Sequence, residues 1–117
     1  MGVKKRILIV EDDADTSEII GVMLAASYEC TAVASRDEAL AQLQSGLSPA
    51  CVLMDFMMPG MPLEDFLQQS KQWNLNIVLM TGHHDAIEMA RISGIASCLQ
   101  KPIRPEFLPA VQRIIGT

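Results

Sequence analysis

The chain lacks the features that mark membrane and secreted proteins. None of its hydrophobic runs approaches the ~18 residues of a membrane-spanning helix. The basic start at residues 1–6 is followed by a short apolar run, 7–10, and then at once by acids, which is the pattern of a strand and not of an export signal. We therefore expect a protein with no membrane partner.

The chain also has few basic residues and no paired cysteines. Lys and Arg number 9 against 14 Asp and Glu, so the formal net charge of -5 argues against direct binding of nucleic acid, which requires a basic face. Cys30, Cys51 and Cys98 are odd in number and far apart, which disfavours a disulfide framework or a zinc site. These features predict a cytoplasmic location.

The length predicts one domain. A chain of 117 residues, of which 50% are hydrophobic, can bury one ordinary core. We expect a single domain over residues 1–117, with no room for a second. An effector would then be another molecule or part of a longer parent chain, and the sequence leaves both open.

Five segments have the character of strands. The apolar runs at residues 7–10, 51–54 and 77–80 are too short for helices and rich in Ile, Val and Leu, as expected of parallel strands buried on both faces. Residues 29–34 and 96–99 are weaker candidates. The sheet is therefore expected to be parallel and five-stranded.

Helical patterns fill the intervals between these strands. The first, 15–26, has one apolar stripe, formed by Ile19, Ile20, Met23 and Leu24. The second begins with the capping box 35–38. The third has Pro62 in its first turn and carries Phe66, Leu67 and Trp73, and the fourth spans about 85–92. Pro105 would occupy the first turn of the last helix, where Pro109 would delay the start or introduce a kink. Strict alternation predicts a doubly wound α/β fold with five helices.

Polar residues follow the predicted strands at the edge where ligands bind in open α/β sheets. They are Glu11, Asp12, Asp13, Asp55, Thr81 and Lys101. Gathered carboxylates would repel each other by about 4 kcal/mol per pair at 4 Å and an effective dielectric of 20, so a cation is expected among them. Oxygen ligands favour Mg²⁺, with Mn²⁺ as an alternative. A hydroxyl and an amine beside such a cation suit the stabilisation of a phosphoryl group.

The motifs at these positions resemble those of bacterial response-regulator receiver domains, the CheY-like family. They are residues 7–13 (ILIVEDD), 54–60 (MDFMMPG), 80–82 (MTG) and 99–102 (LQKP), and the resemblance covers essentially the whole chain. It implies a flavodoxin-like sheet of order 2-1-3-4-5, and often a cis bond between Lys101 and Pro102.

The resemblance also implies roles for individual residues. Asp55 would be the phosphoacceptor, attacking a phosphohistidine to give an acyl phosphate. Mg²⁺ would be held by Asp12, Asp55 and the backbone carbonyl of Met57, with Glu11 bound directly or through water. Lys101 would pair with Asp55 and then with the phosphoryl group, towards which Thr81 would turn. Asp13 would cap the first helix and not bind the metal.

The implied function is a phosphoacceptor in a two-component system, not an enzyme beyond its own phosphorylation and dephosphorylation. The donor would be a sensor histidine kinase or a histidine phosphotransfer protein, with an output partner that the sequence does not name and a homodimer as one possibility. The alternative is a degenerate receiver that acts as a phosphorylation-independent interaction module. A hydrolase of the haloacid dehalogenase type needs an Asp where Met57 stands, and is set aside.

Three positions depart from the family pattern. Cys98 stands where the family places an aromatic residue that moves with the threonine, so we expect a different relay or a small buried filler. Met57 and His83 stand where side chains orient the hydrolytic water. Since neither suits that task, the sequence predicts a long-lived phosphoryl group.

Overall fold

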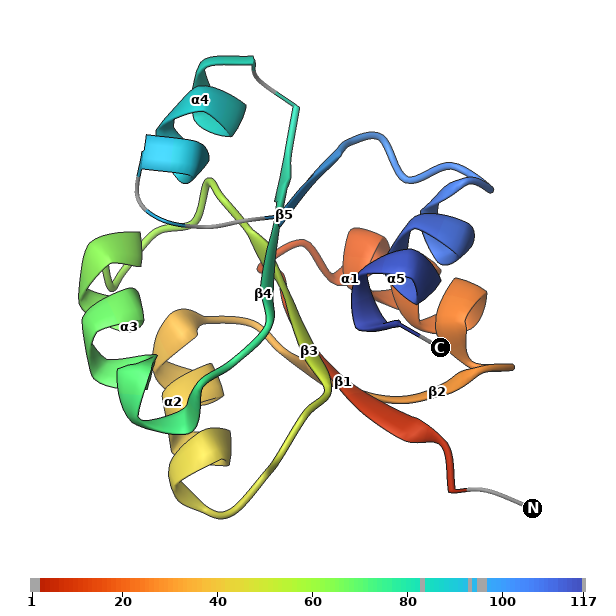
Figure 1. Cartoon of the computed structure of the whole chain (residues 1–117), viewed down its shortest axis with the longest axis horizontal. Coiled ribbons are helices and arrows are strands. Elements are labelled where there is room, and N and C mark those ends of the chain that lie inside the picture. The colour runs from red at the N-terminus through yellow and green to blue at the C-terminus, as the bar shows by residue number, and fades with distance from the viewer. Residues whose placement is uncertain (1–2, 83, 93, 95–96, 117) are drawn as a thin grey trace.

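A five-stranded parallel sheet forms the centre of the fold (Figure 1). A computed structural model of the chain describes residues 3–82, 84–92, 94 and 97–116. The strand order is β2-β1-β3-β4-β5 and all four pairings are parallel, which confirms the expected doubly wound topology. The strands are β1 (Lys5–Val10), β2 (Tyr28–Val33), β3 (Cys51–Asp55), β4 (Ile77–Thr81) and β5 (Ser97–Gln100).

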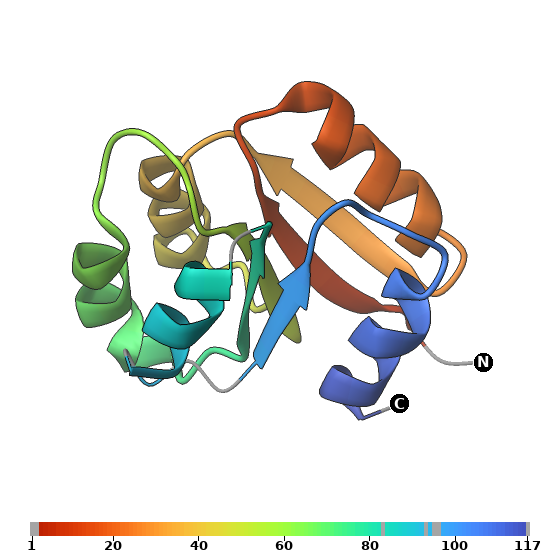
Figure 2. The same ribbon diagram turned by 90° about the horizontal axis from the view of Figure 1, so that it is seen from above.

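Helices cover both faces of the sheet, as Figure 2 shows from above. On one face lie α1 (Ala14–Leu24) and α5 (Phe107–Ile115); on the other lie α2 (Arg36–Gln44), α3 (Leu63–Ser70) and α4 (His84–Ile92). A 3₁₀ turn, η1 (Lys71–Trp73), follows α3. No helix among the described residues is long and apolar enough to cross a membrane.

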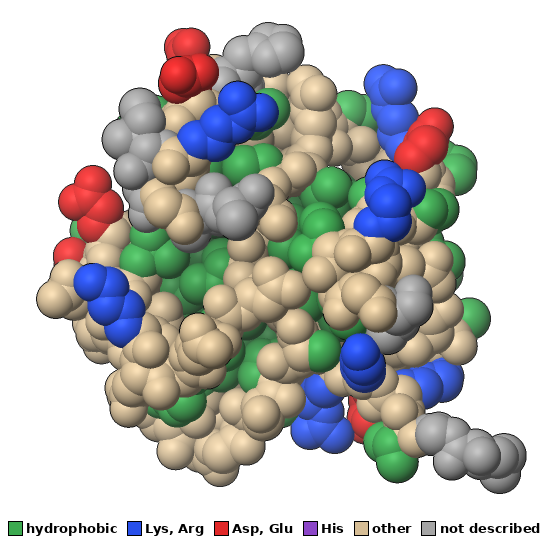
Figure 3. All heavy atoms as spheres, in the orientation of Figure 1, with side chains coloured by type: hydrophobic (Ala, Val, Ile, Leu, Met, Phe, Trp, Pro, Cys, Tyr) green, Lys and Arg blue, Asp and Glu red, His purple; other side chains and the backbone are tan. Residues whose placement is uncertain are grey.

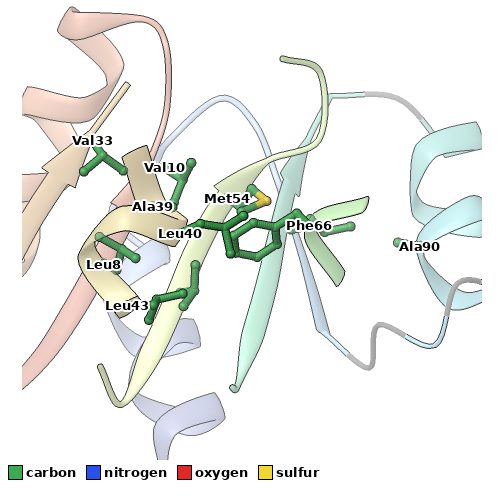
Figure 4. Packing of buried hydrophobic residues seen from close by; sticks show 11 residues of the cluster. Leu8, Val10, Val33, Ala39, Leu40, Leu43, Met54, Phe66 and Ala90 are labelled. Carbon is green, nitrogen blue, oxygen red and sulfur yellow. The ribbon is translucent and has the colours of Figure 1, made fainter. Parts of the chain in front are cut away.

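Two hydrophobic clusters, one on each face, hold the helices to the sheet. Successive side chains of a strand point to opposite faces, so β1 contributes Leu8 and Val10 to one cluster and Ile7 and Ile9 to the other. Figure 4 shows the first cluster, in which Phe66 of α3 lies against the central strands. Burial of β1 on both faces explains its continuous apolar run.

Side-chain caps fix the starts of the first two helices. Asp13 caps α1, accepting hydrogen bonds from Thr16 Oγ1 at 2.8 Å and from the Asp15 amide at 3.2 Å. These bonds stabilise the ionised carboxylate and lower its pKa. Ser35 caps α2, accepting from the amide of Glu38 at 3.1 Å. The Glu38 carboxylate reaches back to the Ala34 amide at 3.0 Å, so the predicted capping box is present with its return bond one residue earlier.

The structure corrects the predicted stripe of the first helix. Ile20 and Leu24 are fully buried and Met23 packs against their cluster, but Ile19 is 51% exposed. The buried positions lie four residues apart, on a stripe too narrow to include Ile19.

Two other helices begin after the prolines that were expected in their first turns. Pro62 is the residue before α3 and not its first turn, and Trp73 lies in η1, beyond the α-helix. The last helix, α5, begins at Phe107, two residues after Pro105, which agrees with the delayed start expected from Pro109. Pro109 therefore lies in the first turn of α5, where the N–H that proline lacks would have no partner within the helix. A kink is expected only of a proline further inside a helix.

Candidate functional site

The carboxyl ends of four strands bring the predicted site residues to one edge of the sheet. Glu11 and Asp12 directly follow β1, Asp55 and Thr81 end β3 and β4, and Lys101 directly follows β5. Strand ends meet there because all the pairings are parallel. The five residues therefore lie at one edge of the sheet.

Three carboxylates converge at this edge. Ligand oxygens of Glu11, Asp12 and Asp55 all lie within 4.8 Å of one another. Glu11 and Asp55 are only 2% and 8% exposed, whereas Asp12 is open to solvent. Carboxylates held this close repel strongly unless a cation neutralises them. An all-oxygen donor set with one open side suits Mg²⁺, which retains several waters when bound to protein.

The ammonium group of Lys101 neutralises part of this charge. Its Nζ donates to Glu11 Oε1 at 2.7 Å and lies 3.4 Å from Asp55 Oδ2. Burial opposes a charged lysine, but the bond to Glu11 and the charges of both carboxylates outweigh it and raise the pKa of Lys101. In this structure the lysine is therefore shared between two acids, with the shorter contact to Glu11.

The surroundings of Glu11 change the pKa of its carboxyl group. Burial, partly offset by the bond from Lys101, raises its pKa from 4.5 to about 7. The nearby Asp55 carboxylate acts in the same direction as burial, because two negative charges disfavour each other. Glu11 consequently takes up a proton far more readily than an ordinary glutamate.

Backbone contacts connect the strands that carry Thr81 and Lys101. The amide of Lys101 donates to the Thr81 carbonyl at 2.9 Å, and the Lys101–Pro102 peptide bond is cis, as the resemblance suggested. Thr81 is 1% exposed. Its position at the end of β4 puts it at the same edge as the acids.

The loop after β3 brings a backbone donor to the phosphoacceptor candidate. The Met57 amide donates to Asp55 Oδ1 at 3.4 Å, and the Met57 side chain is 63% exposed. The exposed thioether has no acidic or amide group with which to orient water. Its carbonyl as a metal ligand stays a prediction.

The structure describes Cys98, one of the positions that depart from the family pattern. Cys98 is half-buried in β5 and packs against the cluster that includes Leu79 and Ala90. Burial raises the pKa of the Cys98 thiol, which favours an inert filler over a reactive group. His83 lies outside the described residues.

Sequence reasoning missed Arg36. Its side chain is 2% exposed beneath the loop that follows Asp55. The signal was present, since Arg36 stands four and seven residues before Leu40 and Leu43, on the buried stripe of α2. An arginine on such a stripe is ordinarily taken for a solvated charge, so the sequence alone did not mark it.

Comparison with known proteins gives a consistent set of relatives. A model of the response regulator receiver domain matches residues 7–113. The DNA-binding response regulator MtrA of Mycobacterium tuberculosis is 29% identical over 111 residues, covering 92% of this chain and 48% of that protein. The transcriptional regulatory protein FixJ of Bradyrhizobium diazoefficiens is 29% identical over 116 residues, covering 95% of this chain and 56% of that protein. The chain thus spans about half the length of these curated relatives.

Solved structures agree with these relatives. A protein from Chloroflexus aurantiacus, crystallised as a candidate response regulator, superposes with a TM-score of 0.86 at 28% identity, covering 98% of this chain and 100% of that one. The chemotaxis response regulator CheY4 of Vibrio cholerae gives 0.83 at 24% identity, covering 96% and 99%, and supports the fold alone.

Proposed function

The chain belongs to the response regulator receiver domain family of two-component systems, and on that premise we propose that it takes a phosphoryl group onto Asp55 in a Mg²⁺-dependent reaction. The donor is a phosphohistidine of a sensor histidine kinase or a histidine phosphotransfer protein. Residues 1–117 form one receiver domain, which works in the cytoplasm. The function is signalling and not turnover of a separate substrate.

One observation carries this proposal: the Asp55 carboxylate is held among Glu11, Asp12 and Lys101. Its oxygens lie within 4.8 Å of ligand oxygens of both other acids, and Lys101 Nζ lies 3.4 Å from Oδ2. A degenerate receiver that served only for protein contacts would have no need to confine three acids and a lysine in this way. The arrangement costs stability without a cation, which supports a functional purpose.

The residues fit a magnesium ion by the chemistry of their donors. Glu11, Asp12 and Asp55 supply oxygen ligands, and we assign the Met57 carbonyl to the same set. When bound, Mg²⁺, or Mn²⁺ in its place, would neutralise charge on the phosphoryl oxygens.

The chain's own groups divide the remaining work. A carboxylate oxygen of Asp55 attacks phosphorus and forms a P–O bond while the P–N bond to the donor histidine breaks, and the leaving imidazole takes up a proton from water. Lys101 exchanges its contact with Asp55 for one with the transferred group. Thr81 donates to another phosphoryl oxygen. The protein supplies position and charge, which is the usual protein contribution to phosphoryl transfer.

The edge strand β5 is where we place contact with an output partner or a second copy of the chain. Ser97, Cys98 and Leu99 are each half-buried with no strand beyond them in the described sheet. Figure 3 looks onto this edge and shows hydrophobic side chains reaching the surface between α4 and α5. Partly apolar edges of this kind suit regulated association.

The experiment that tests the proposal is intact-mass measurement after incubation with acetyl phosphate. We expect a gain of one phosphoryl group in the presence of Mg²⁺ and none in the presence of a chelator, because the confined carboxylates need a cation before they can approach an anionic donor. A receiver known to be modified serves as the positive control. If that control gains mass and this chain does not, the interaction-module alternative replaces the proposal.

The affinity for Mg²⁺ is expected to rise with pH up to about 7. Glu11, with its pKa raised to about 7, carries a proton below that pH, and the proton must leave before the oxygen can bind metal. Apparent affinity should therefore fall by up to about tenfold per pH unit below 7 and level off above it. Isothermal titration calorimetry across this range measures it.

Glu11→Gln is the control for this pH dependence, because its amide does not titrate. The variant should bind Mg²⁺ more weakly but with a flatter pH profile, and an unchanged profile would assign the titration to another group. The same linkage predicts that the metal-free parent loses stability as pH rises from 4.5 towards about 7, since its folded state retains a proton that the unfolded chain releases.

A further inference from the structure

A buried guanidinium lies directly beneath the loop that joins β3 to α3. Arg36 opens α2 and is 2% exposed, and all four of its hydrogen bonds described here go to uncharged groups. Three acceptors are backbone carbonyls and the fourth is the sulfur of Met54, at 3.3 Å. Burying an arginine is costly, so its retention at this place calls for a purpose.

The three carbonyls lie at the two ends of that loop. Nη2 donates to the carbonyls of Asp55 at 3.2 Å and Phe56 at 3.0 Å, and Nη1 donates to the carbonyl of Met61 at 2.8 Å. The rigid planar fork of arginine can engage several acceptors at once, which a lysine ammonium at the end of a flexible chain cannot do with the same geometry. One side chain thus clamps both the exit from β3 and the entry to α3.

The hydrogen bonds from Arg36 fix the orientation of two successive peptide units, Asp55–Phe56 and Phe56–Met57. In a trans peptide the C=O and N–H groups point in opposite directions. The Asp55 carbonyl points to Arg36 while the Phe56 amide donates to the Met80 carbonyl at 3.0 Å. In the next unit the Phe56 carbonyl points to Arg36, so the Met57 amide faces the Asp55 carboxylate, 3.4 Å from Oδ1.

We propose that Arg36 is a positioning residue of the phosphoacceptor site, acting through the backbone to aim the Met57 amide at Asp55. It also sets the direction of the adjoining peptide, whose carbonyl is our assigned metal ligand. Arg36 thereby controls Mg²⁺ affinity and the rate of phosphoryl uptake without touching either group. The rate part of this inference rests on the proposed function, whereas the part concerning the backbone does not.

The charge of Arg36 is compatible with this role. Burial lowers the pKa of the guanidinium and the nearby Asp55 charge raises it, but an arginine keeps its proton at any pH at which the protein is folded. Its positive charge therefore lies permanently under an acidic site.

The test compares Arg36→Met, which keeps the volume and removes the donors, with Arg36→Lys, which keeps the charge and removes the fork. We expect Arg36→Met to weaken Mg²⁺ binding and slow phosphoryl uptake by about tenfold to a hundredfold, the scale of a small misplacement of reacting groups. The ¹H–¹⁵N resonance of the Met57 amide should shift in the metal-free protein. Arg36→Lys should recover part of the affinity but not the parent resonance.

Leu40→Ala is the matched control. Leu40 lies one turn further along α2, is 5% exposed and packs in the core. Its aliphatic side chain has no donor for the loop carbonyls. It should lower the melting temperature while leaving Mg²⁺ affinity, uptake rate and the Met57 resonance of the folded protein unchanged.

Arg36→Met behaving like Leu40→Ala would overturn the inference and reduce Arg36 to a structural residue. If Arg36→Met does not fold, Arg36→Lys provides the test. A parent-like Met57 resonance and a parent-like Mg²⁺ affinity in that variant would also overturn the inference. Should the parent chain take up no phosphoryl group, the proposed function fails, yet the calorimetric and resonance measurements still test Arg36.

Discussion

Asp55→Asn is expected to gain no phosphoryl group from acetyl phosphate under conditions in which the parent chain gains one. The carboxamide keeps the shape of the side chain but is a poor nucleophile, so the substitution removes the reaction and leaves the packing. Asp55 is 8% exposed and ends a strand whose other residues are fully buried, so its backbone is held in place. Intact mass and peptide mapping measure the loss.

A matched substitution separates this effect from a general change in charge. Asp65→Asn replaces an exposed acid in the first turn of α3, outside the site, and should gain mass as the parent does. Asp12 is the other residue that could accept the phosphoryl group, because its carboxylate is exposed and lies in the same cluster. A phosphoryl group on Asp12 in the Asp55→Asn protein would show that the cluster, and not Asp55, determines the acceptor.

The sheet could be predicted from the sequence because its strands are buried on both faces. The run at Ile7 to Val10 divides its side chains between two hydrophobic clusters, and such continuous hydrophobicity is typical of a central parallel strand. The strand order was a different matter. It came from resemblance, since alternation of strands and helices does not by itself choose among the doubly wound orders.

Helix boundaries were less accessible, for reasons local to each end. Asp13 and Ser35 were recognisable because a capping side chain follows a simple rule. Pro62 and Pro105 suggested first turns, where proline is common, but both residues lie before the helix starts. The pattern of α1 alone does not show which edge of its apolar stripe faces the sheet, and Ile19 lies on the exposed edge.

Some features of the candidate site could be predicted from the sequence and others could not. Its charged groups could be found because the ends of parallel strands share an edge, so position in the sequence predicts proximity. The division of Lys101 between Glu11 and Asp55 could not be found, because it depends on distances of 2.7 and 3.4 Å. Arg36 was missed because an arginine on a buried helix stripe is ordinarily taken for a solvated charge, and residue identities do not show that its partners are backbone carbonyls distant in sequence.

Lys101→Met is expected to slow phosphoryl uptake by about 10²- to 10³-fold, the usual effect of removing one donor to developing charge. Metal affinity should change in the opposite direction. In the metal-free structure the ammonium bonds to Glu11 at 2.7 Å and so competes with a cation for the same oxygen. Without it, three confined carboxylates have one counter-charge fewer, and Mg²⁺ should bind more tightly.

Tighter metal binding together with a slower reaction is the distinguishing sign of Lys101, because loss of folding would weaken the binding and slow the reaction. Calorimetric titration with Mg²⁺ and the rate of mass gain, measured on the same preparation, give the two quantities. Lys71→Met makes the same change in charge at an exposed position in η1 and should alter neither. If Lys101→Met loses affinity and rate together, the lysine organises the site as a whole. If its rate is unchanged, the ammonium serves only to neutralise Glu11 and Asp55 until the metal arrives.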